Sequence, residues 1–252
     1  MIKIFNFSPL KIIFILAFIV YITASLRTMV QVPFYDFDEA HRAENAKRMK
    51  EYKSFLVPLT GSSFDRVEHL KIPFKDNPDF YLYYHLERPP LTYILMIIST
   101  TIFGNYEWTY RLPSFLLGMT IFAAFLFFAK KEDKNNIFAI ALGFFVIFTS
   151  SDLWLSSQYA QMDTGITLFL FLSLLSLIYY CSFRKTFWLF LSGIFLGLSV
   201  LSKLQPVVIF VFPVLGLLIF KKLNLKELLK LIGGFLLIFL PWLFYLIFRF
   251  GI

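Results

Sequence analysis

Acidic side chains crowd together at one point of a chain that is otherwise mostly apolar. Three carboxylates stand within four residues in Asp36-Phe37-Asp38-Glu39, directly before a stretch of good helix formers. Capping a helix needs only one acid, and three acids this close repel one another. A carboxylate held near other acids and near lipid can be tuned as a general base. We therefore predict that Asp38 and Glu39 are catalytic, with helix capping as the alternative.

Isolated charged side chains lie beside apolar runs elsewhere in the chain. Arg88 precedes one such run in Glu87-Arg88-Pro89-Pro90, and an arginine at a membrane boundary can grip phosphate through two parallel hydrogen bonds. Pairing with Glu87 or with lipid headgroups is the alternative. Asp163 and Lys203 stand at the ends of other apolar runs, where helix capping and snorkelling are the ordinary explanations. A functional role for Asp163 and Lys203 is favoured only if they lie on the same face of the membrane as the other charged candidates.

Patterns typical of metal and redox sites are sparse. His41, His69 and His85 are scattered, and the two-histidine spacing of zinc proteases does not occur. His85 stands two residues before Glu87, so these two residues are the candidates for a divalent-metal site, with headgroup contact as the alternative. The single Cys181 excludes an intramolecular disulfide and a cysteine-based zinc site. A divalent metal ion is the one cofactor left open.

Composition indicates an integral membrane protein. The 252 residues are 58% hydrophobic and 16% charged and include 34 Phe, with a mean hydropathy of +0.72. The net charge of +8 would suggest nucleic acid in a soluble domain, but in a membrane protein it reflects basic cytoplasmic loops. Nucleic acid is therefore excluded as a partner, and the lipid bilayer is expected as one.

Long apolar runs predict an all-α, polytopic transmembrane helical bundle that forms a single module over 1–252. About seven spans are expected, near 12–35, 113–129, 137–153, 164–182, 187–202, 206–220 and 228–250. A signal peptide is the alternative for the first run. The first external loop, 32–112, contains a run from Leu91 to Phe103 that is too short to span, so this loop is expected to carry juxtamembrane or re-entrant helices. The remaining spans occupy 113–252.

The basic connectors determine the expected orientation. Lys130-Lys131, Arg184-Lys185 and Lys221-Lys222 all fall on one side if Leu91 to Phe103 does not cross, and the positive-inside rule places that side in the cytoplasm. The candidate residues then share the opposite, external face: Asp36, Asp38, Glu39, Glu87, Arg88, Arg111, Asp152, Asp163 and Lys203.

Four groups of short motifs together resemble a known family. In chain order they are Asp38-Glu39 with Ala43-Glu44; Arg88-Pro89-Pro90-Leu91 with Phe103-Gly104 and Arg111-Leu112-Pro113-Ser114; Met162-Asp163; and Gly197-Leu198 with Leu201-Ser202-Lys203. Over about residues 10–215 the chain resembles the N-terminal module of the polyprenol-dependent GT-C membrane glycosyltransferases, in the protein mannosyltransferase and aminoarabinose transferase superfamily. Arg88 stands where many members have Lys, and His41-Arg42 replaces a commoner Arg-aromatic pair. Relatives also continue with further membrane helices.

The resemblance implies an inverting transfer of sugar from a polyprenyl-phosphate donor to an acceptor lipid, glycan or protein, on the outer face of a bacterial inner membrane. It implies roles for the candidate residues: Asp38 and Glu39 in catalysis, Arg88, Arg111 and Lys203 at the donor phosphate, and Glu87, Asp163 and His41 at the sugar or acceptor. A second subunit that completes the module is a further expected partner. The alternative function is a non-catalytic partner subunit or a lipid-sugar flippase.

Overall fold

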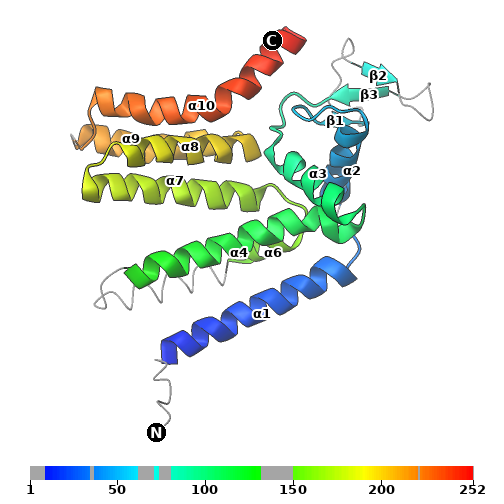
Figure 1. The fold of residues 1–252 in the computed structure, drawn as a ribbon, viewed down its shortest axis with the longest axis horizontal. Coiled ribbons are helices and arrows are strands. Elements are labelled where there is room, and N and C mark those ends of the chain that lie inside the picture. Colours follow the sequence, from blue (N-terminus) through cyan, green and yellow to red (C-terminus); the bar gives the residue numbers. More distant parts are fainter. Residues whose placement is uncertain are drawn as a thin grey trace.

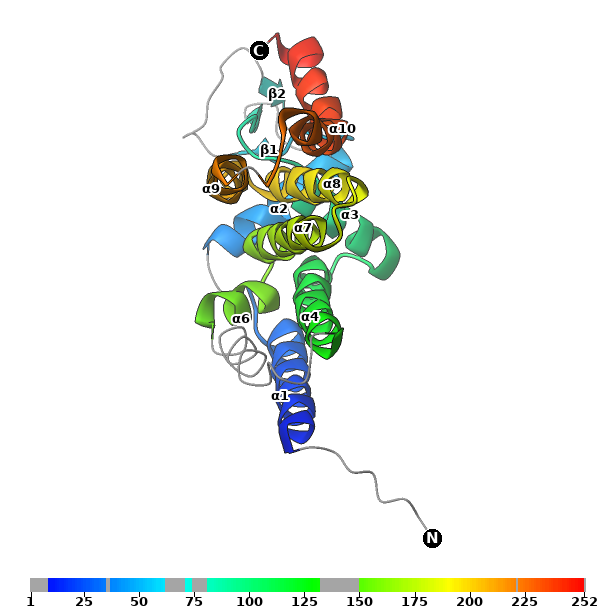
Figure 2. The same cartoon turned by 90° about the vertical axis from the view of Figure 1, so that its left-hand side faces the viewer.

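Helices lying side by side form most of the protein. The computed structural model describes residues 9–34, 37–61, 71–73, 81–131, 150–220 and 222–251. The bundle contains α1 (Pro9–Gln31), α4 (Glu107–Lys131), α6 (Ser151–Gln158), α7 (Asp163–Phe183), α8 (Phe187–Ser202), α9 (Pro206–Ile219) and α10 (Leu225–Phe250). They run roughly alongside one another (Figure 1). Seen end-on, α4, α7, α8 and α10 stack in a column and α9 lies to one side (Figure 2).

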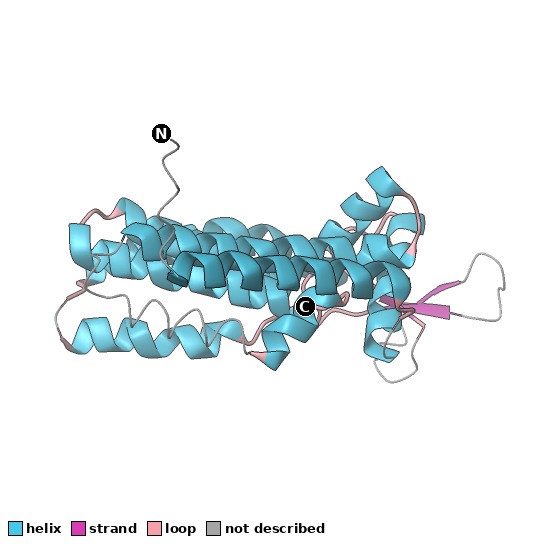
Figure 3. Ribbon diagram, turned by 90° about the horizontal axis from the view of Figure 1, so that it is seen from below, coloured by secondary structure: helices cyan, strands magenta, loops and turns pink. Residues whose placement is uncertain are grey.

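A separate group of elements, here called the end layer, covers one end of this bundle. It consists of α2 (Phe37–Glu51), α3 (Leu91–Phe103) and the strands β1 (Leu59–Thr60), β2 (Lys71–Pro73) and β3 (Tyr81–Tyr84). The strands form an antiparallel sheet in the order β1-β3-β2. The end layer lies where α4 and α7 begin and where α8 and α10 finish (Figures 1 and 3). Residues from distant parts of the sequence therefore meet there.

Small residues allow α8 to pack closely on α7 and α10. A Cβ placed on Gly193 of α8 would overlap the backbone of Leu231, and one on Gly234 of α10 would overlap the backbone of Phe190. On the other side of α8, Ser192 and Ser173 of α7 each donate from the side chain to the other's backbone carbonyl, at 2.9 and 2.7 Å. Small residues and hydroxyl hydrogen bonds are typical of helix packing in lipid.

The expected apolar segments coincide with helices wherever the structure describes them. The run from Leu91 to Phe103 forms α3, whose 13 residues extend about 20 Å, less than the thickness of a bilayer core. Among the described residues, α7 and α10 are long and apolar enough to cross a membrane by themselves, whereas α8 and α9 are shorter apolar helices. Most of the expected span 137–153 lies outside the described residues. The count of seven spans therefore remains a prediction.

Two features of the end layer were not expected from the sequence. The tyrosine-rich segment Tyr81–Tyr84 forms the central strand of the sheet. The last part of α10, beyond the helix-internal Pro241, bends toward the sheet (Figure 1). Its Trp242 donates from Nε1 to the Leu56 carbonyl at 3.0 Å, so the end of the bundle is anchored to the segment after α2.

Candidate active site

Asp38 stands in the first turn of α2 with its carboxylate open to solvent. The helix carries Asp38 and Glu39 in its first turn and Arg48 and Lys50 in its last, which suits the direction of the helix dipole. Arg42, one turn further on, donates from Nη2 to Asp38 Oδ2 at 2.9 Å, and 61% of the Asp38 side chain is exposed. The carboxylate is therefore oriented by its own helix and accessible to a substrate.

Glu39, the neighbouring acid, is completely buried. Arg111 of α4 donates to both of its oxygens, from Nε at 2.6 Å and from Nη2 at 2.8 Å. The backbone N–H of Ala160 donates to Glu39 Oε1 at 2.9 Å. The rings of Phe34 and Tyr159 lie 5.6 and 5.4 Å from the guanidinium carbon. Glu39 therefore ties α2 to α4 and to the segment that leads into α7.

The remaining N–H groups of Arg111 bind the end of α1 and the segment after it. They donate to the backbone carbonyls of Thr28 at 3.2 Å, Met29 at 3.3 Å, Pro33 at 2.8 Å and Val32. Carbonyls at a helix C-terminus lack partners within the helix, and an arginine can satisfy them. Because both side chains are buried and bonded within the chain, this geometry does not fit the expected roles of Glu39 in catalysis and Arg111 at a donor phosphate.

The charges of Arg88 and Asp38 act on the same histidine, His41. Burial lowers the pKa of His41, which follows Asp38 by one turn of α2; the positive charges of Arg88 and Arg48 lower that pKa further, and Asp38 opposes them. His41 Nε2 lies 3.4 Å from the hydroxyl of Thr60, at the end of β1. The charges of two residues 50 positions apart thus act on one imidazole.

The packing of α3 against α2 places Arg88. One buried apolar cluster joins residues of α3 to residues of α2: Tyr93, Met96 and Ile97 with Ala43, Ala46 and Met49. Arg88 stands just before α3, which begins at Leu91, and its Nε donates to His85 Nε2 at 3.3 Å. The packing of α3 on α2 therefore holds Arg88 at the edge of this interface.

Asp163 and Lys203 form a second charged group at the same end of the bundle. Lys203 Nζ lies 3.3 Å from Asp163 Oδ1, and the two side chains are 40% and 46% exposed. The pair joins the start of α7 to the end of α8, where Ser199 also donates to the Ile166 carbonyl at 3.1 Å. Asp163 and Lys203 therefore lie together at one end of the bundle, and both are accessible.

Glu87 and His85 lie at the turn before α3. Glu87 is exposed, whereas His85 is buried with 5% of its surface accessible. No group of three or more His, Cys, Asp or Glu side chains that could hold a metal ion occurs among the described residues. Two side chains supply fewer ligands than the sites of divalent ions normally use. The arrangement therefore gives no support to a metal site at Glu87 and His85.

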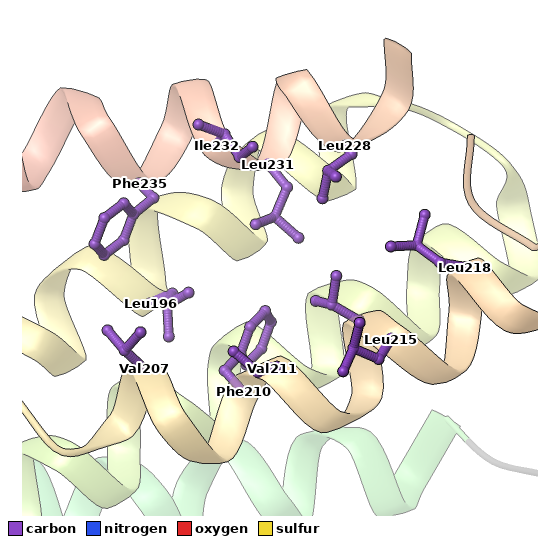
Figure 4. A pocket seen from close by; sticks show the side chains of 11 residues that line it. Leu196, Val207, Phe210, Val211, Leu215, Leu218, Leu228, Leu231, Ile232 and Phe235 are labelled. Atoms are coloured by element: carbon purple, nitrogen blue, oxygen red, sulfur yellow. The ribbon is translucent and has the colours of Figure 1, made fainter. Parts of the chain in front are cut away.

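An apolar cleft runs between α8, α9 and α10. Its volume is about 320 Å³, and Figure 4 shows the side chains that line it: Leu196, Val207, Phe210, Val211, Val214, Leu215, Leu218, Leu228, Leu231, Ile232 and Phe235. Val207, at one end, is in the first turn of α9, four residues after Lys203. The cleft therefore starts near the Asp163–Lys203 pair and continues along α9 into the bundle.

Asn45, Arg48 and Tyr93 lie beside the candidate site but were not expected there from the sequence. Asn45 and Arg48 follow Arg42 at intervals of three residues, so the three share one face of α2. The three-residue spacing was the feature of the sequence that could have revealed this polar face of α2. It could not show that the face is covered by α3 and β1 rather than by solvent.

Comparisons with known proteins point to one family and one fold. Residues 87–245 match the family described as dolichyl-phosphate-mannose-protein mannosyltransferase. The structure is similar to ArnT from Cupriavidus metallidurans in its apo state, with a TM-score of 0.71 and 16% identity over 97% of this chain and 43% of that one. ArnT bound to undecaprenyl phosphate matches with a TM-score of 0.70 and 17% identity, over 94% of this chain and 42% of that one. Curated protein sequences give no significant match.

Proposed function

The chain belongs to the dolichyl-phosphate-mannose-protein mannosyltransferase family, and from this premise we propose that it transfers a sugar from a polyprenyl-phosphate donor to an acceptor at the external membrane face. The observation that carries the proposal is the exposed carboxylate of Asp38 on α2, with Arg88 just before α3, the helix that packs on α2; the charges of both residues act on His41. The chain spans less than half the length of the ArnT structures it matches.

In the proposed reaction Asp38 is the general base. Its carboxylate accepts the proton of the acceptor hydroxyl while the acceptor oxygen forms a bond to the anomeric carbon of the sugar. The bond between that carbon and the phosphate oxygen breaks, and its electron pair remains on the departing polyprenyl phosphate. Arg42 holds Asp38 Oδ2 at 2.9 Å, so the carboxylate is kept in one orientation during this step.

Arg88 and Lys203 are assigned to the departing phosphate, whose negative charge rises as the bond breaks. Lys203 is 40% exposed and lies four residues before the apolar cleft begins at Val207. The prenyl chain of the donor is assigned to this cleft, because its lining is apolar and a hydrocarbon tail must stay out of water. One of the similar ArnT structures is bound to undecaprenyl phosphate, a lipid of this class.

Glu39 and Arg111 are assigned to positioning. Their buried pair joins α2 to α1, α4 and the segment before α7, and Asp38 is the residue immediately before Glu39. Glu87, Asp163 and His41 are assigned to the sugar or the acceptor. Glu87 and Asp163 are accessible carboxylates at the same end of the bundle, and the charges of Asp38 and Arg88 both act on His41.

The test is transfer of label from radiolabelled polyprenyl-phosphate sugars in membranes that contain the protein. Asp38→Asn should lower turnover by about 10²- to 10⁴-fold, the usual contribution of a general base. Glu51→Gln, an exposed acid at the other end of the same helix, is the matched control and should retain full activity. Equal turnover of Asp38→Asn and wild type would remove Asp38 from its role.

Absence of turnover with every labelled donor, in a protein that still binds polyprenyl phosphate, would favour a non-catalytic partner subunit. Binding is measured separately, by the rise in unfolding temperature that the phosphorylated lipid produces. Arg88→Gln should reduce that rise, because it removes a charge assigned to the phosphate. The two measurements therefore distinguish a binding module from an enzyme.

A further inference from the structure

One face of α2 carries, beside the exposed general base Asp38, polar side chains that the proposed transfer does not use to bind substrate. Asp38, Arg42, Asn45 and Arg48 are separated by four, three and three residues, so they lie along one face of the helix. The Arg42 and Arg48 side chains are only 11% and 18% exposed, and Asn45 is completely buried. Charged and amide groups are rarely this buried without partners.

Several of these groups lack a hydrogen-bond partner. In the part of the chain that the structure describes, Nε and Nη1 of Arg42 are buried without a hydrogen-bond partner, and the buried amide of Asn45 has only the Tyr93 hydroxyl beside it. Arg42 uses only Nη2, which holds Asp38. A buried polar group without a hydrogen-bond partner lowers the stability of the folded state. The cost is larger for a charged guanidinium than for a neutral group. The face therefore has a set of donors ready for an acceptor.

Residues from other elements enclose the same groups. Burial raises the pKa of the Tyr93 hydroxyl of α3; Arg88, Asn45 and Arg42, which lie around it, act in the opposite direction. On the side of β1, a Cβ placed on Gly61 would lie only 2.9 Å from Arg48 Nη1. The donors of α2 thus lie between α3 and the segment after β1.

The charge of this face is positive. Arg42, Arg48 and Arg88 each lower the pKa of His41 through their positive charge. Two carboxylates offset them, because Asp38 pairs with Arg42 at 2.9 Å and Glu44 pairs with Arg48 at 3.0 Å. An oxyanion is the ligand class that matches several N–H donors and an excess of positive charge.

We propose that Arg42 and Asn45, supported by Arg48, bind a second oxyanion, a phosphate or carboxylate of a substrate, separate from the donor phosphate assigned to Arg88 and Lys203. The proposal rests on the proposed function and adds a substrate class to it, namely a substrate with a further anionic group. Arg42 contacts Asp38 directly, so an oxyanion bound there lies beside the general base. A substrate held by this group is thereby positioned for deprotonation or attack at Asp38.

The probe is inorganic phosphate, added to the purified full chain in detergent at constant ionic strength. Binding to the folded state should raise the unfolding temperature in a saturable manner. Potassium chloride at equal ionic strength is the control, because it screens charges to the same extent without supplying phosphate. Undecaprenyl phosphate, added to phosphate-saturated protein, should produce a further rise, because it occupies the other site.

Two variants of the face test its residues. Arg42→Gln removes the charged donors, and Asn45→Asp keeps the side-chain shape but adds a repelling charge. Each should weaken phosphate binding by about tenfold or more, the loss expected for a charge-assisted hydrogen bond. Arg88→Gln should weaken binding of undecaprenyl phosphate and leave most binding of inorganic phosphate unchanged. Lys47→Gln, an exposed lysine of the same helix, is the control and should change neither.

The proposal is overturned if chloride stabilises the protein as strongly as phosphate, if phosphate and the lipid exclude each other, or if Asn45→Asp folds and binds phosphate as wild type does. Loss of lipid binding alone would instead count against the proposed function. Competition of phosphate with a polyprenyl-phosphate hexuronate, whose sugar carries a carboxylate, would place the oxyanion on the donor. If phosphate and this donor do not compete, the oxyanion belongs to the acceptor.

Discussion

Removing one member of the buried Glu39–Arg111 pair should destabilise the protein far more than removing one member of an exposed pair. Glu39→Ala leaves a fully buried guanidinium without a counter-charge and the Ala160 N–H without its acceptor. Breaking a buried ion pair costs about 3–5 kcal/mol, and an unpaired backbone donor adds about 1–3 kcal/mol. The two costs are not fully additive, because both arise from the loss of the same carboxylate. We therefore expect a loss of about 4–6 kcal/mol in the free energy of unfolding.

The matched control is Asp163→Ala, which breaks an ion pair of 3.3 Å whose side chains are 40% and 46% exposed. Solvent screens such a pair, so its loss should cost less than about 1 kcal/mol. The assay is reversible unfolding in mixed micelles with increasing dodecyl sulfate, followed by tryptophan fluorescence. Expression and monodispersity of each variant are checked first, because a loss of this size approaches the whole stability of many domains.

A double-mutant cycle then identifies the source of the loss. Arg111→Ala should cost at least as much as Glu39→Ala, because it also removes the donors to the end of α1. The double variant should cost less than the sum of the two single variants, since each single change leaves a buried partner uncompensated. A Glu39→Ala protein as stable as Asp163→Ala would refute the inference that this pair holds α2 on the bundle.

Three further predictions concern the charge of the site, the packing of the bundle and its orientation. Arg88→Gln should raise the pKa of His41, because one of the positive charges that lower it is removed; a pH titration of the ring by NMR measures this, with Lys47→Gln unchanged. Gly193→Leu should lower the unfolding temperature, because its side chain would collide with the backbone of α10, whereas Gly216→Leu, whose Cβ meets nothing within 4 Å, should have little effect. In a Cys181→Ser background, single cysteines at 163 and 203 should react with an impermeant external reagent and one at 222 should not; the reverse pattern would contradict the outward orientation.

The sequence allowed helix positions in the bundle to be predicted well. Leu91–Phe103 and Phe187–Ser202 were expected as apolar segments and form α3 and α8 with the same bounds. An apolar run limited by proline, glycine or charge is a local property, so one stretch of sequence contains enough information to locate it. The small sheet was missed because its strands are two to four residues long and pair with distant segments. No single stretch of that length specifies its partner.

Sequence alone showed that acidic and basic residues collect at the ends of apolar runs, and that these ends share a face if the runs alternate across a membrane. It could not distinguish Asp38 from Glu39, because two adjacent carboxylates have the same chemistry. Consecutive residues of a helix point about 100° apart, so only the packing of α2 against its neighbours decided their environments. That packing buried Glu39 against Arg111 and left Asp38 exposed. The tertiary structure thus made one acid a structural link and left the other an accessible carboxylate, because burial depends on which surfaces meet and not on residue type.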